Sequence, residues 1–568
     1  MDSHPCPFAL FFAPDAYSLA TKIMGRQSAG HSLLRAMSGR AGSGLIHAAG
    51  PVPAGEAALR EQLHAFGSLA QLRWHSLHTP ETLADIGALY LPAPPMASVA
   101  ALRNGVRPAA FSCFGVTHTL ASEGAMAQLA ALTLPPFKNW DALICTSRAA
   151  RAVFDRIRDE TRETFARETG ATHFPDVQAP IIPLGVDAHA FAPRVDIRAE
   201  MRRTLGLGER DVMLLSAGRL TFHAKFNPVP LYRALAALPG AQRRRVMLVE
   251  AGIYPNDGIA QAYRQAQATF LPDVRVETVD GREQNRFNAL WQAADIFISL
   301  SDNVQETFGL TPLEAMAAGL PVIASDWDGY RDTVRHGQDG FLVPTVMAAA
   351  GQGMDLARRY AAGLDHYDMY IGRLSLAAMV DHEALHSALV TLISDSALRA
   401  RMGASGQRRV RTDFDWSHIL DRYAALCGTL AEIRQKAVRD RMETAPNRPD
   451  PFALFSSYPT RQLSTRDRIV VPPLAGDELR QCLALKMTNF GFDDAVMPLA
   501  VMPHLLHLAA ASSPRVGDLI KTAGVEPAVA ARGLLWLAKF GLVTIQPASS
   551  SSEGASCADM EESETLSP

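Results

Sequence analysis

Short apolar runs alternate with amphipathic stretches in two successive series along this chain. The first series places candidate strands at residues 9–13, 44–48, 88–91, 110–116 and 143–146. The second places them at 212–217, 246–250, 274–279, 296–300, 321–325 and 340–343, with helices expected at 228–237, 284–294 and 312–318. Strands that alternate with helices form parallel sheets covered on both faces. The sequence therefore predicts an α/β protein with two Rossmann-like, doubly wound domains, whose ligands bind at the carboxyl ends of the strands in a cleft between the domains.

Changes in composition predict the domain boundaries. The length of 568 residues exceeds what one hydrophobic core supports. We expect a first domain at residues 1–190, which ends after the turn-rich connector 183–187, a second at 191–415, and a helix at 416–436. Residues 437–473 are rich in Arg, Asp, Pro and Ser and predict a linker, and a small, mainly helical module follows at 474–547. The Ser- and Glu-rich residues 548–568 predict a disordered tail.

The C-terminal module resembles the helix-turn-helix half of a winged-helix fold over residues 516–543. Its supposed recognition stretch, residues 527–540, offers only Arg532 and Lys539 as cations. A helix that reads DNA carries more basic side chains than this. We therefore do not expect a nucleic acid partner, and we expect the module to serve docking of a protein partner or self-association.

Overall charge and cysteine usage restrict the class of protein further. The formal net charge is −3, from 55 basic and 58 acidic residues, so no global field gathers nucleic acid or anionic lipid. The six cysteines show no zinc-type spacing, which predicts reduced thiols in a cytoplasmic protein. The apolar stretch at residues 8–13 is read as a buried first strand and not as a signal peptide. The three arginines at 243–245 could meet a membrane-bound lipid acceptor at the inner face of the membrane, although such a run is more often a solvated edge.

The segment from Glu306 to Ser325 carries the most chemical information. Thr311 is a suitable N-cap, and Glu314 stands three residues later, which predicts a capping box. A helix that starts there points the backbone N–H groups of residues 309–311 and the positive end of its dipole into the cleft. A diphosphate fits such an end. The two carboxylates of Glu306 and Glu314 could accept hydrogen bonds from ligand hydroxyls; alternatively, Glu314 only caps its helix and Glu306 is solvated.

This segment, with its two Glu residues eight positions apart, resembles the signature of the retaining glycosyltransferases of family 4, also called group 1, whose fold is named GT-B. The resemblance extends over most of residues 8–435. Arg219 and Lys225 follow a strand and are similar to the pair that holds the donor diphosphate in that family. His118, at the end of another strand, is placed like the histidine that approaches the donor sugar, and a structural role is equally open. Gly25 lies in a loop similar to the one near donor and acceptor.

The resemblance implies a metal-independent enzyme that transfers a sugar from a nucleoside diphosphate donor with retention at the anomeric carbon. Glu306 and His118 would act at the sugar, and Glu314 would bind the ribose. The diphosphate would meet Arg219, Lys225 and the segment formed by Phe308, Gly309, Leu310 and Thr311. The helix at 416–436 would cross back to the first domain. Neither a metal ion nor a cofactor is expected, and the nucleotide sugar enters as co-substrate.

Other readings of the same residues stay open. A hydrolase or epimerase on the GT-B fold would use a similar donor site, and a non-catalytic scaffold or regulator could act through the C-terminal module. The chain also departs from the family at residues 328–332, where paired glycines and a later Glu are common, and at residues 250–254, where glycines are more frequent. These changes leave the donor base and sugar open. The acceptor could be a saccharide, a lipid-linked sugar or a small molecule.

Overall fold

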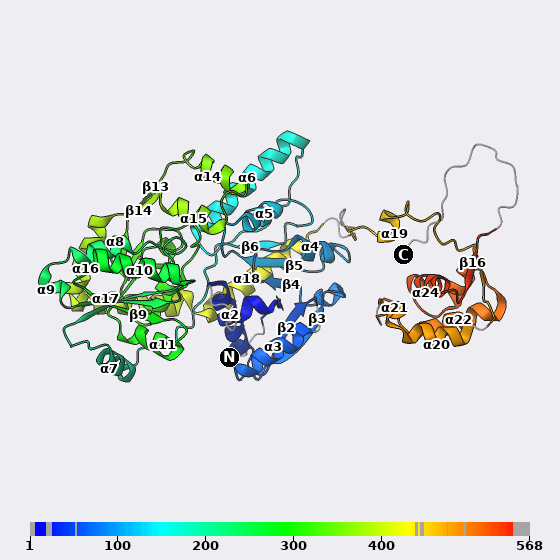
Figure 1. Cartoon of the computed structure of the whole chain (residues 1–568), viewed down its shortest axis with the longest axis horizontal. Helices are drawn as coiled ribbons and strands as arrows, with labels where there is room; N and C mark the ends of the chain where they lie inside the picture. Colours follow the sequence, from blue (N-terminus) through cyan, green and yellow to red (C-terminus); the bar gives the residue numbers. More distant parts are fainter. Residues whose placement is uncertain are drawn as a thin grey trace. The chain divides into compact units, whose positions relative to one another are not determined.

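The computed structural model describes residues 6–18, 25–51, 54–437, 441–443, 448–473, 475–493 and 496–548. The chain divides into two units, Met1–Asn447 and Arg448–Pro568, which are treated separately below. Figure 1 shows two sheets in the first unit, one in blue to cyan and one in green, each flanked by helices. The tail expected to be disordered lies, apart from Ala548, outside the described residues.

The first sheet has six parallel strands in the order β3-β2-β1-β4-β5-β6. The strands are β1 (Ala9–Phe11), β2 (Leu45–Gly50), β3 (Gln71–Ser76), β4 (Ala88–Leu91), β5 (Ser112–Val116) and β6 (Ala142–Ile144). The helices are α1 (Pro14–Tyr17), α2 (Gly25–Ala41), α3 (Ala54–Ala65), η1 (Pro80–Leu83), α4 (Ala97–Asn104), α5 (Glu123–Ala131) and α6 (Arg148–Thr169). Strand β3 was not among the predicted strands. It is an edge strand that exposes Gln71 and Arg73, so it lacks a continuous apolar run.

The second sheet also has six parallel strands, in the order β12-β11-β10-β7-β8-β9. They are β7 (Val212–Ala217), β8 (Val246–Gly252), β9 (Arg275–Asp280), β10 (Ile296–Ser299), β11 (Val322–Ser325) and β12 (Gly340–Val343). Helices around it are α7 (Val195–Thr204), α8 (Val229–Ala236), α9 (Gly240–Arg243), α10 (Asp257–Phe270), α11 (Gln284–Ala293), α12 (Leu310–Ala317), α13 (Tyr330–Thr333), α16 (His382–Ser394), α17 (Ser396–Arg409) and η2 (Val410–Phe414). The prediction of two doubly wound domains is confirmed.

A small substructure is inserted between β12 and α16. It consists of β13 (Thr345–Met347), α14 (Met354–Ala361), α15 (Tyr367–Ser375) and β14 (Ala378–Val380), and its two strands pair antiparallel. The hydroxyl of Tyr360 on α14 accepts a hydrogen bond of 3.0 Å from the backbone N–H of Glu123, at the start of α5. The insertion therefore contacts the first domain from the second.

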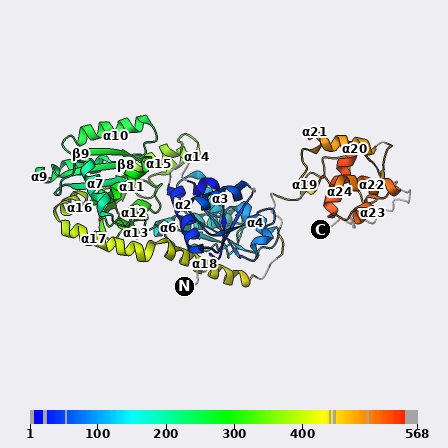
Figure 2. The same cartoon turned by 90° about the horizontal axis from the view of Figure 1, so that it is seen from below.

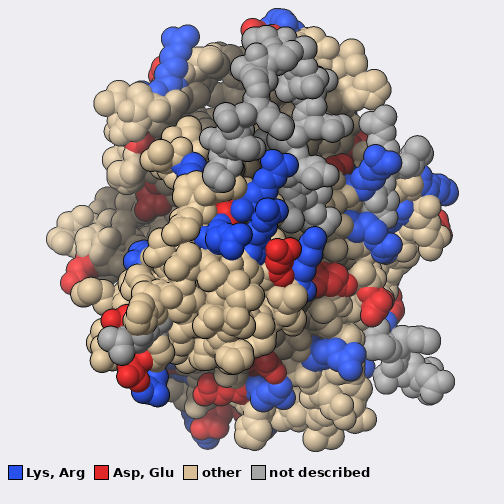
Figure 3. Space-filling model, turned by 90° about the vertical axis from the view of Figure 1, so that its right-hand side faces the viewer, with Lys and Arg blue, Asp and Glu red and all other residues tan. Residues whose placement is uncertain are grey.

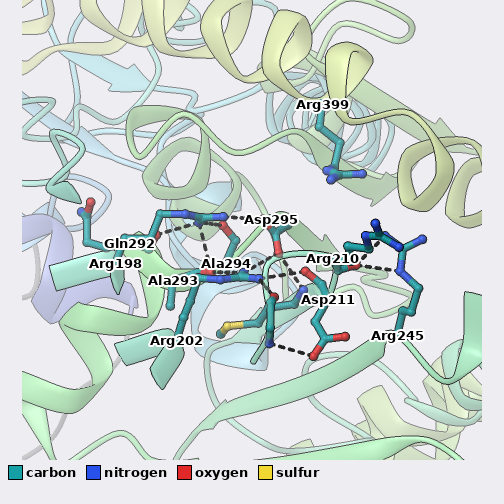
Figure 4. Close-up of polar contacts among 12 residues, drawn as sticks. Arg198, Arg202, Arg210, Asp211, Arg245, Gln292, Ala293, Ala294, Asp295 and Arg399 are labelled. Carbon is teal, nitrogen blue, oxygen red and sulfur yellow. Dashed lines mark hydrogen bonds and ion pairs between the residues drawn. The ribbon is translucent and has the colours of Figure 1, made fainter. Parts of the chain in front are cut away.

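Two arginines of α7 bind backbone and side-chain groups at the amino ends of β7 and β10 (Figure 4). Arg198 donates to the carbonyl of Ala294 at 2.7 Å, just past the end of α11, and to Asp295 at 2.5 Å. Arg202 donates to the other Asp295 oxygen at 2.8 Å, which also accepts from the backbone N–H of Met213. Cations at a helix C-terminus satisfy its last carbonyls. This network fixes the amino ends of β7 and β10. The candidate site lies at the opposite, carboxyl ends of these strands.

The three arginines at 243–245 run from the last residue of α9 to the start of β8. Arg243 donates to the carbonyl of Ala236 at 2.7 Å, and Arg245 donates to the carbonyl of Arg210 at 2.7 Å (Figure 4). Two of the three cations thus have partners within the domain. The run closes a turn at the amino end of β8, and we do not propose it as a lipid contact.

Helix α18 (Trp416–Gln435) starts at the second domain and packs on the first, along the underside seen in Figure 2. The indole N–H of Trp416 donates to Ser32 Oγ at 2.6 Å. Tyr423 packs among the aromatic rings of Phe8, Tyr90 and Phe114, and Arg434 donates to the carbonyl of Gly87 at 2.6 Å. The two sheets are therefore joined both by the connector near residue 187 and by this long helix.

The C-terminal unit combines helices with one short antiparallel pair of strands. Its elements are α19 (Pro451–Leu454), β15 (Arg468–Val470), α20 (Ala475–Ala484), α21 (Lys486–Asn489), α22 (Val501–Ser512), α23 (Val516–Thr522), α24 (Pro527–Lys539) and β16 (Thr544–Gln546). Strand β15 lies inside the stretch that was expected to be linker. It belongs to this unit because Ile469 is fully buried in the core with Leu505, Leu534 and Leu537.

The surface of the C-terminal unit bears on the expected partners. The two cations of α24 are engaged locally: Arg532 donates to the carbonyl of Val496 at 2.9 Å, and Lys539 lies over the ring of Phe540. Figure 3 shows a broad area without charged side chains on one side of the molecule, with Lys, Arg, Asp and Glu gathered around it. Met487 and Phe490 of this unit are 93% and 83% exposed. A protein partner stays a prediction.

Within the described ranges, no helix combines the length and the apolar character needed to cross a bilayer.

Candidate active site

The loop between β10 and α12 forms the centre of the candidate site. Helix α12 begins at Leu310 with Gly309 as its N-cap, and no side chain caps it. The predicted capping box of Thr311 and Glu314 is therefore wrong. Gly309 has φ of +83°, and a Cβ there would lie 2.0 Å from the ring of Tyr330, so only glycine fits. The ring of Tyr330 thus fixes where the helix starts.

The earlier start still leaves first-turn amides for a ligand. The first N–H groups of a helix have no intrahelical partner, and they add to the positive end of the dipole. In α12 these are the amides that begin at Leu310 and Thr311. The hydroxyl of Thr311 is buried and has no hydrogen-bond partner among the described residues. A ligand oxygen at this end would find both donors.

Lys225 and Glu306 form an ion pair beside this helix end. Their side chains are 20% and 13% exposed, so water screens the pair only in part. Burial alone would raise the pKa of Glu306, but the Lys225 ammonium and the backbone N–H groups of Thr307 and Phe308 hold it below its usual range. Burial alone would lower the pKa of Lys225, but the Glu306 carboxylate raises it. Both groups are therefore charged at neutral pH.

Glu314 and Arg219 complete the second-domain side of the site. Burial raises the pKa of the half-buried Glu314 to about 7, against a small opposing effect of Lys225. Arg219 follows β7 directly, and its charge acts on Lys225. The structure thus brings together Arg219, Lys225, Glu306 and Glu314 at the carboxyl ends of β7 and β10.

The predicted donor residues Phe308 and Leu310 are placed differently from one another. The side chain of Phe308 is 2% exposed and belongs to the main core of the unit. A Cβ on Gly329 would lie 2.4 Å from the Cα of Phe308, so the loop at 329 presses directly on this backbone. Only backbone atoms of Phe308 can face a ligand, whereas the side chain of Leu310 is half-buried.

His118 and Gly25 lie on the first-domain side. His118 follows β5, and its Nε2 lies 3.1 Å from the carbonyl of Pro92, to which it donates. Burial and the charge of Arg26 lower the pKa of His118 to about 4, so the ring is neutral at pH 7 with Nδ1 as an acceptor. Gly25 is the exposed first residue of α2, next to Arg26, which pairs with Asp15 at 2.5 Å. His118 therefore cannot serve as a general acid at neutral pH.

Three polar residues near the site were not among the predicted site residues, although two of them lie in the segment 328–332 noted as a departure from the family. Tyr330 holds the loop through a 2.7 Å hydrogen bond to Ser299. Burial raises the pKa of Asp302 to about 7, and one of its carboxylate oxygens has no partner among the described residues. Asp328 has φ of +46° and accepts from Ser147 of the first domain at 3.3 Å. Asp302 shortly follows the end of β10. A polar residue at the carboxyl end of a predicted strand is a sequence signal that could have indicated a site residue here.

Glu250 explains the departure at residues 250–254. It is 2% exposed, and its carboxyl group accepts from the hydroxyl of Tyr232 at 2.7 Å and from Gln267 at 2.6 Å. Burial raises its pKa above the ordinary value. Both carboxyl oxygens of Glu250 thus have hydrogen-bond partners inside the second domain.

Within the described residues, no three His, Cys, Asp or Glu side chains gather as a metal site would need.

Comparison with known proteins identifies the domain that carries the ion pair. Residues 197–356 match the family model of glycosyl transferases group 1. This stretch is similar to the group 1 glycosyltransferases. It contains Arg219, Lys225, Glu306 and Glu314. The resemblance to group 1 glycosyltransferases made from the sequence is confirmed, and the resemblance of the C-terminal module to a winged helix stays a prediction.

Curated relatives carry the same group of names. The chain is 34% identical over 197 residues to the D-inositol 3-phosphate glycosyltransferase of Geodermatophilus obscurus, and the match covers 32% of this chain and 40% of the relative. It is 33% identical over 149 residues to the phosphatidyl-myo-inositol mannosyltransferase of Mycobacterium leprae, and this match covers 26% of this chain and 30% of the relative. The chain spans less than half the length of these relatives.

A solved structure matches across both domains. HepE of Anabaena, crystallised with UDP, aligns with a TM-score of 0.50 at 16% identity and covers 74% of this chain and 99% of HepE. At this identity the likeness concerns the fold alone. It shows that the two Rossmann-like domains of this chain form the GT-B arrangement.

Proposed function

We propose that this protein transfers a sugar from a nucleoside diphosphate donor to an acceptor hydroxyl, with retention at the anomeric carbon and without a metal ion. The observation that carries the proposal is the Lys225–Glu306 ion pair beside the first-turn amides of α12, in a stretch that matches group 1 glycosyltransferases. Fixed positive charge at that point is what departure of a diphosphate requires.

The donor diphosphate binds at the amides of residues 309–311, with Arg219 and Lys225 beside it. Lys225 then exchanges part of its contact with Glu306 for phosphate oxygens. Glu306 is left with free acceptor capacity, and a hydroxyl of the donor sugar can donate to it. Glu314, whose pKa is about 7, accepts from the ribose hydroxyls in its ionised form. Charge-assisted hydrogen bonds of this kind are about twice as strong as neutral ones.

In the reaction, the bond between the anomeric carbon and the diphosphate oxygen breaks, and the nucleoside diphosphate leaves with the electron pair. The acceptor oxygen forms the new bond to the anomeric carbon, and its hydroxyl proton passes to a phosphate oxygen of the leaving group. Arg219, Lys225 and the amides of α12 stabilise the charge that develops on the leaving group. Removal of one such preorganised donor typically costs about 10²–10³ in kcat. His118 is neutral and serves as a hydrogen-bonding group near the sugar, not as an acid.

The donor and acceptor are proposed by class only. UDP-sugars are the first donors to test, because HepE was crystallised with UDP. The named relatives act on D-inositol 3-phosphate and on phosphatidyl-myo-inositol, so polyols and lipid-linked polyols are the first acceptors to test beside saccharides.

The proposal is tested with the full chain and a panel of nucleotide sugars in EDTA. Thermal shift finds the donor, and mass spectrometry then follows transfer to a mixed panel of saccharide, polyol and lipid-linked acceptors. We expect one donor to stabilise the protein and one acceptor to gain the mass of the sugar. Release of free sugar at the same rate with and without every acceptor would favour a hydrolase instead. No stabilisation by any donor would contradict the proposal.

A further inference from the structure

Two aspartates of the second domain lie on the N-terminal end of α6 in the first domain. Ser147 is the N-cap of this 22-residue helix; its Oγ accepts from the N–H of Ala150 at 3.0 Å and donates to Asp328 at 3.3 Å. Asp332 accepts from the backbone N–H of Arg148 at 2.7 Å and from its guanidinium at 2.5 Å. A helix N-terminus stabilises negative charge, so the carboxylate of Asp332 is well placed, whereas Asp328 is held there by its hydrogen bond from the Ser147 hydroxyl.

The loop that carries these aspartates is interlocked with the donor-side loop. Gly329 leaves no room for a Cβ against the backbone of Phe308, and Gly309 leaves none against the ring of Tyr330. Tyr330 in turn is tied to Ser299 at the end of β10. Because each loop fills the space that a side chain of the other would need, residues 306–309 and 328–330 can shift only together.

Asp328 adopts a conformation that residues other than glycine seldom take, with φ of +46°. Burial and the nearby charge of Glu306 raise its pKa well above the ordinary value. Asp328 therefore lies within electrostatic reach of Glu306 on one side and contacts Ser147 on the other. The strained backbone of Asp328 thus occurs at a residue that makes a contact between the two domains.

We propose that Asp328 and Asp332 are positioning residues that fasten the first domain to the donor-side loop through the N-terminal end of α6. This inference rests on the proposed function, because donor binding is what reorganises the Lys225–Glu306 pair. When the loop at 306–309 is held as in the structure, both aspartates meet α6 and the first domain is fixed over the donor. Closure of the cleft and occupation of the donor site are thereby coupled.

The test compares full-length variants by hydrogen exchange at the amide of Arg148, resolved by NMR or by overlapping peptides. Asp332→Ala removes its acceptor, and Asp328→Gly removes the carboxyl group while relieving the backbone, so neither change strains the loop. The matched control is Asp326→Ala, since Asp326 lies in the same loop but pairs with the exposed Arg331 at 3.3 Å. We expect exchange at least about tenfold faster in Asp332→Ala and faster in Asp328→Gly, with the control unchanged.

The kinetic readout uses the donor found by the binding panel. Asp332→Ala should raise KM for the donor about tenfold with kcat changed less, and Asp332→Glu should restore most of the loss, because its carboxylate still reaches Arg148. Exchange at Arg148 equal to wild type in both variants would overturn the inference even if transfer is intact. Faster exchange in a protein that transfers no sugar would support the contact and contradict only the proposed function.

Discussion

The ammonium of Lys225 and the carboxylate of Glu306 form an ion pair, although one follows β7 and the other precedes α12. Each group holds the other in its charged form. Since both side chains are mostly buried, neither can lose its partner without cost. We therefore assign the pair two purposes: it stabilises the second domain, and it holds a cation next to the helix end at which we propose that the diphosphate binds.

Replacement of Lys225 by Ala should affect both purposes. Glu306 would be left without its cation, and we expect a loss of about 1–3 kcal/mol in the free energy of unfolding, measured by urea denaturation. The kcat of transfer should fall by about 10²–10³ because the leaving diphosphate loses one fixed charge. The control is Arg331→Ala, which removes an exposed cation of the same domain. Equal activity of the two variants would contradict the role of Lys225.

Glu314 should make stability depend on pH in a defined direction. Its folded pKa is about 7 and its ordinary value is 4.5, so the folded state holds the proton more tightly than the unfolded state. The stabilising contribution is full below pH 4.5 and is lost as the pH rises through about 7. Relative to Glu314→Gln, wild type should lose about 2 kcal/mol between pH 5 and 8 in denaturation experiments. Parallel curves for the two proteins would refute this assignment.

Donor affinity should depend on the same proton in the opposite sense. If, as proposed, the ribose hydroxyls donate to the ionised carboxylate, the Kd of the donor decreases as the pH rises from 6 to 8. In Glu314→Gln the Kd should be about tenfold higher and nearly independent of pH, which corresponds to the loss of one charge-assisted hydrogen bond. Calorimetric titrations at three pH values measure both effects. A pH dependence that survives in the variant would assign it to another group.

Gly309 should tolerate no side chain. In Gly309→Ala the new Cβ meets the ring of Tyr330, and the positive φ adds backbone strain, so we expect a loss of about 2–4 kcal/mol in stability together with weaker donor binding. Gly351→Ala is the matched control, since Gly351 has φ of +91° in open space and carries the strain without the clash. Equal losses in the two variants would show that the ring of Tyr330 does not set the start of α12.

His118 should leave no trace in the pH–rate profile at neutral pH. Its pKa of about 4 keeps the ring neutral throughout pH 5–8. His118→Gln should preserve a hydrogen-bonding side chain and change kcat by less than about tenfold, with the shape of the profile unchanged above pH 5. Loss of a limb near pH 6.5 in the variant would mean that His118 titrates as an acid or base.

The parts of the fold that local sequence determines were predicted well. The apolar runs at 212–217 and 340–343 coincide with β7, which is fully buried, and with β12, an edge strand whose residues are buried or half-buried. Strand β3 was missed because an edge strand exposes alternate residues. Strand β15 was missed because its partner β16 lies far along the chain and a three-residue strand leaves little pattern.

The sequence predicted that the main site residues lie together, but it did not predict the residues that contact them. Glu306, Glu314, Arg219 and Lys225 follow the ends of adjacent strands or lie in α12, and the family resemblance of these segments grouped them. The helix start at Gly309 depends on the ring of Tyr330, and no local pattern contains that contact. The contact of Asp328 with Ser147 joins residues 181 positions apart in two domains, so only the folded chain shows it.

The most direct test of metal-independent donor binding is calorimetric titration of the stabilising nucleotide sugar into wild type, Glu314→Ala and Lys225→Ala, in EDTA and then with added Mg²⁺. The account predicts binding to wild type of equal strength in both buffers and a Kd at least about tenfold higher in each variant. Binding that requires Mg²⁺, or equal binding to all three proteins, would contradict it.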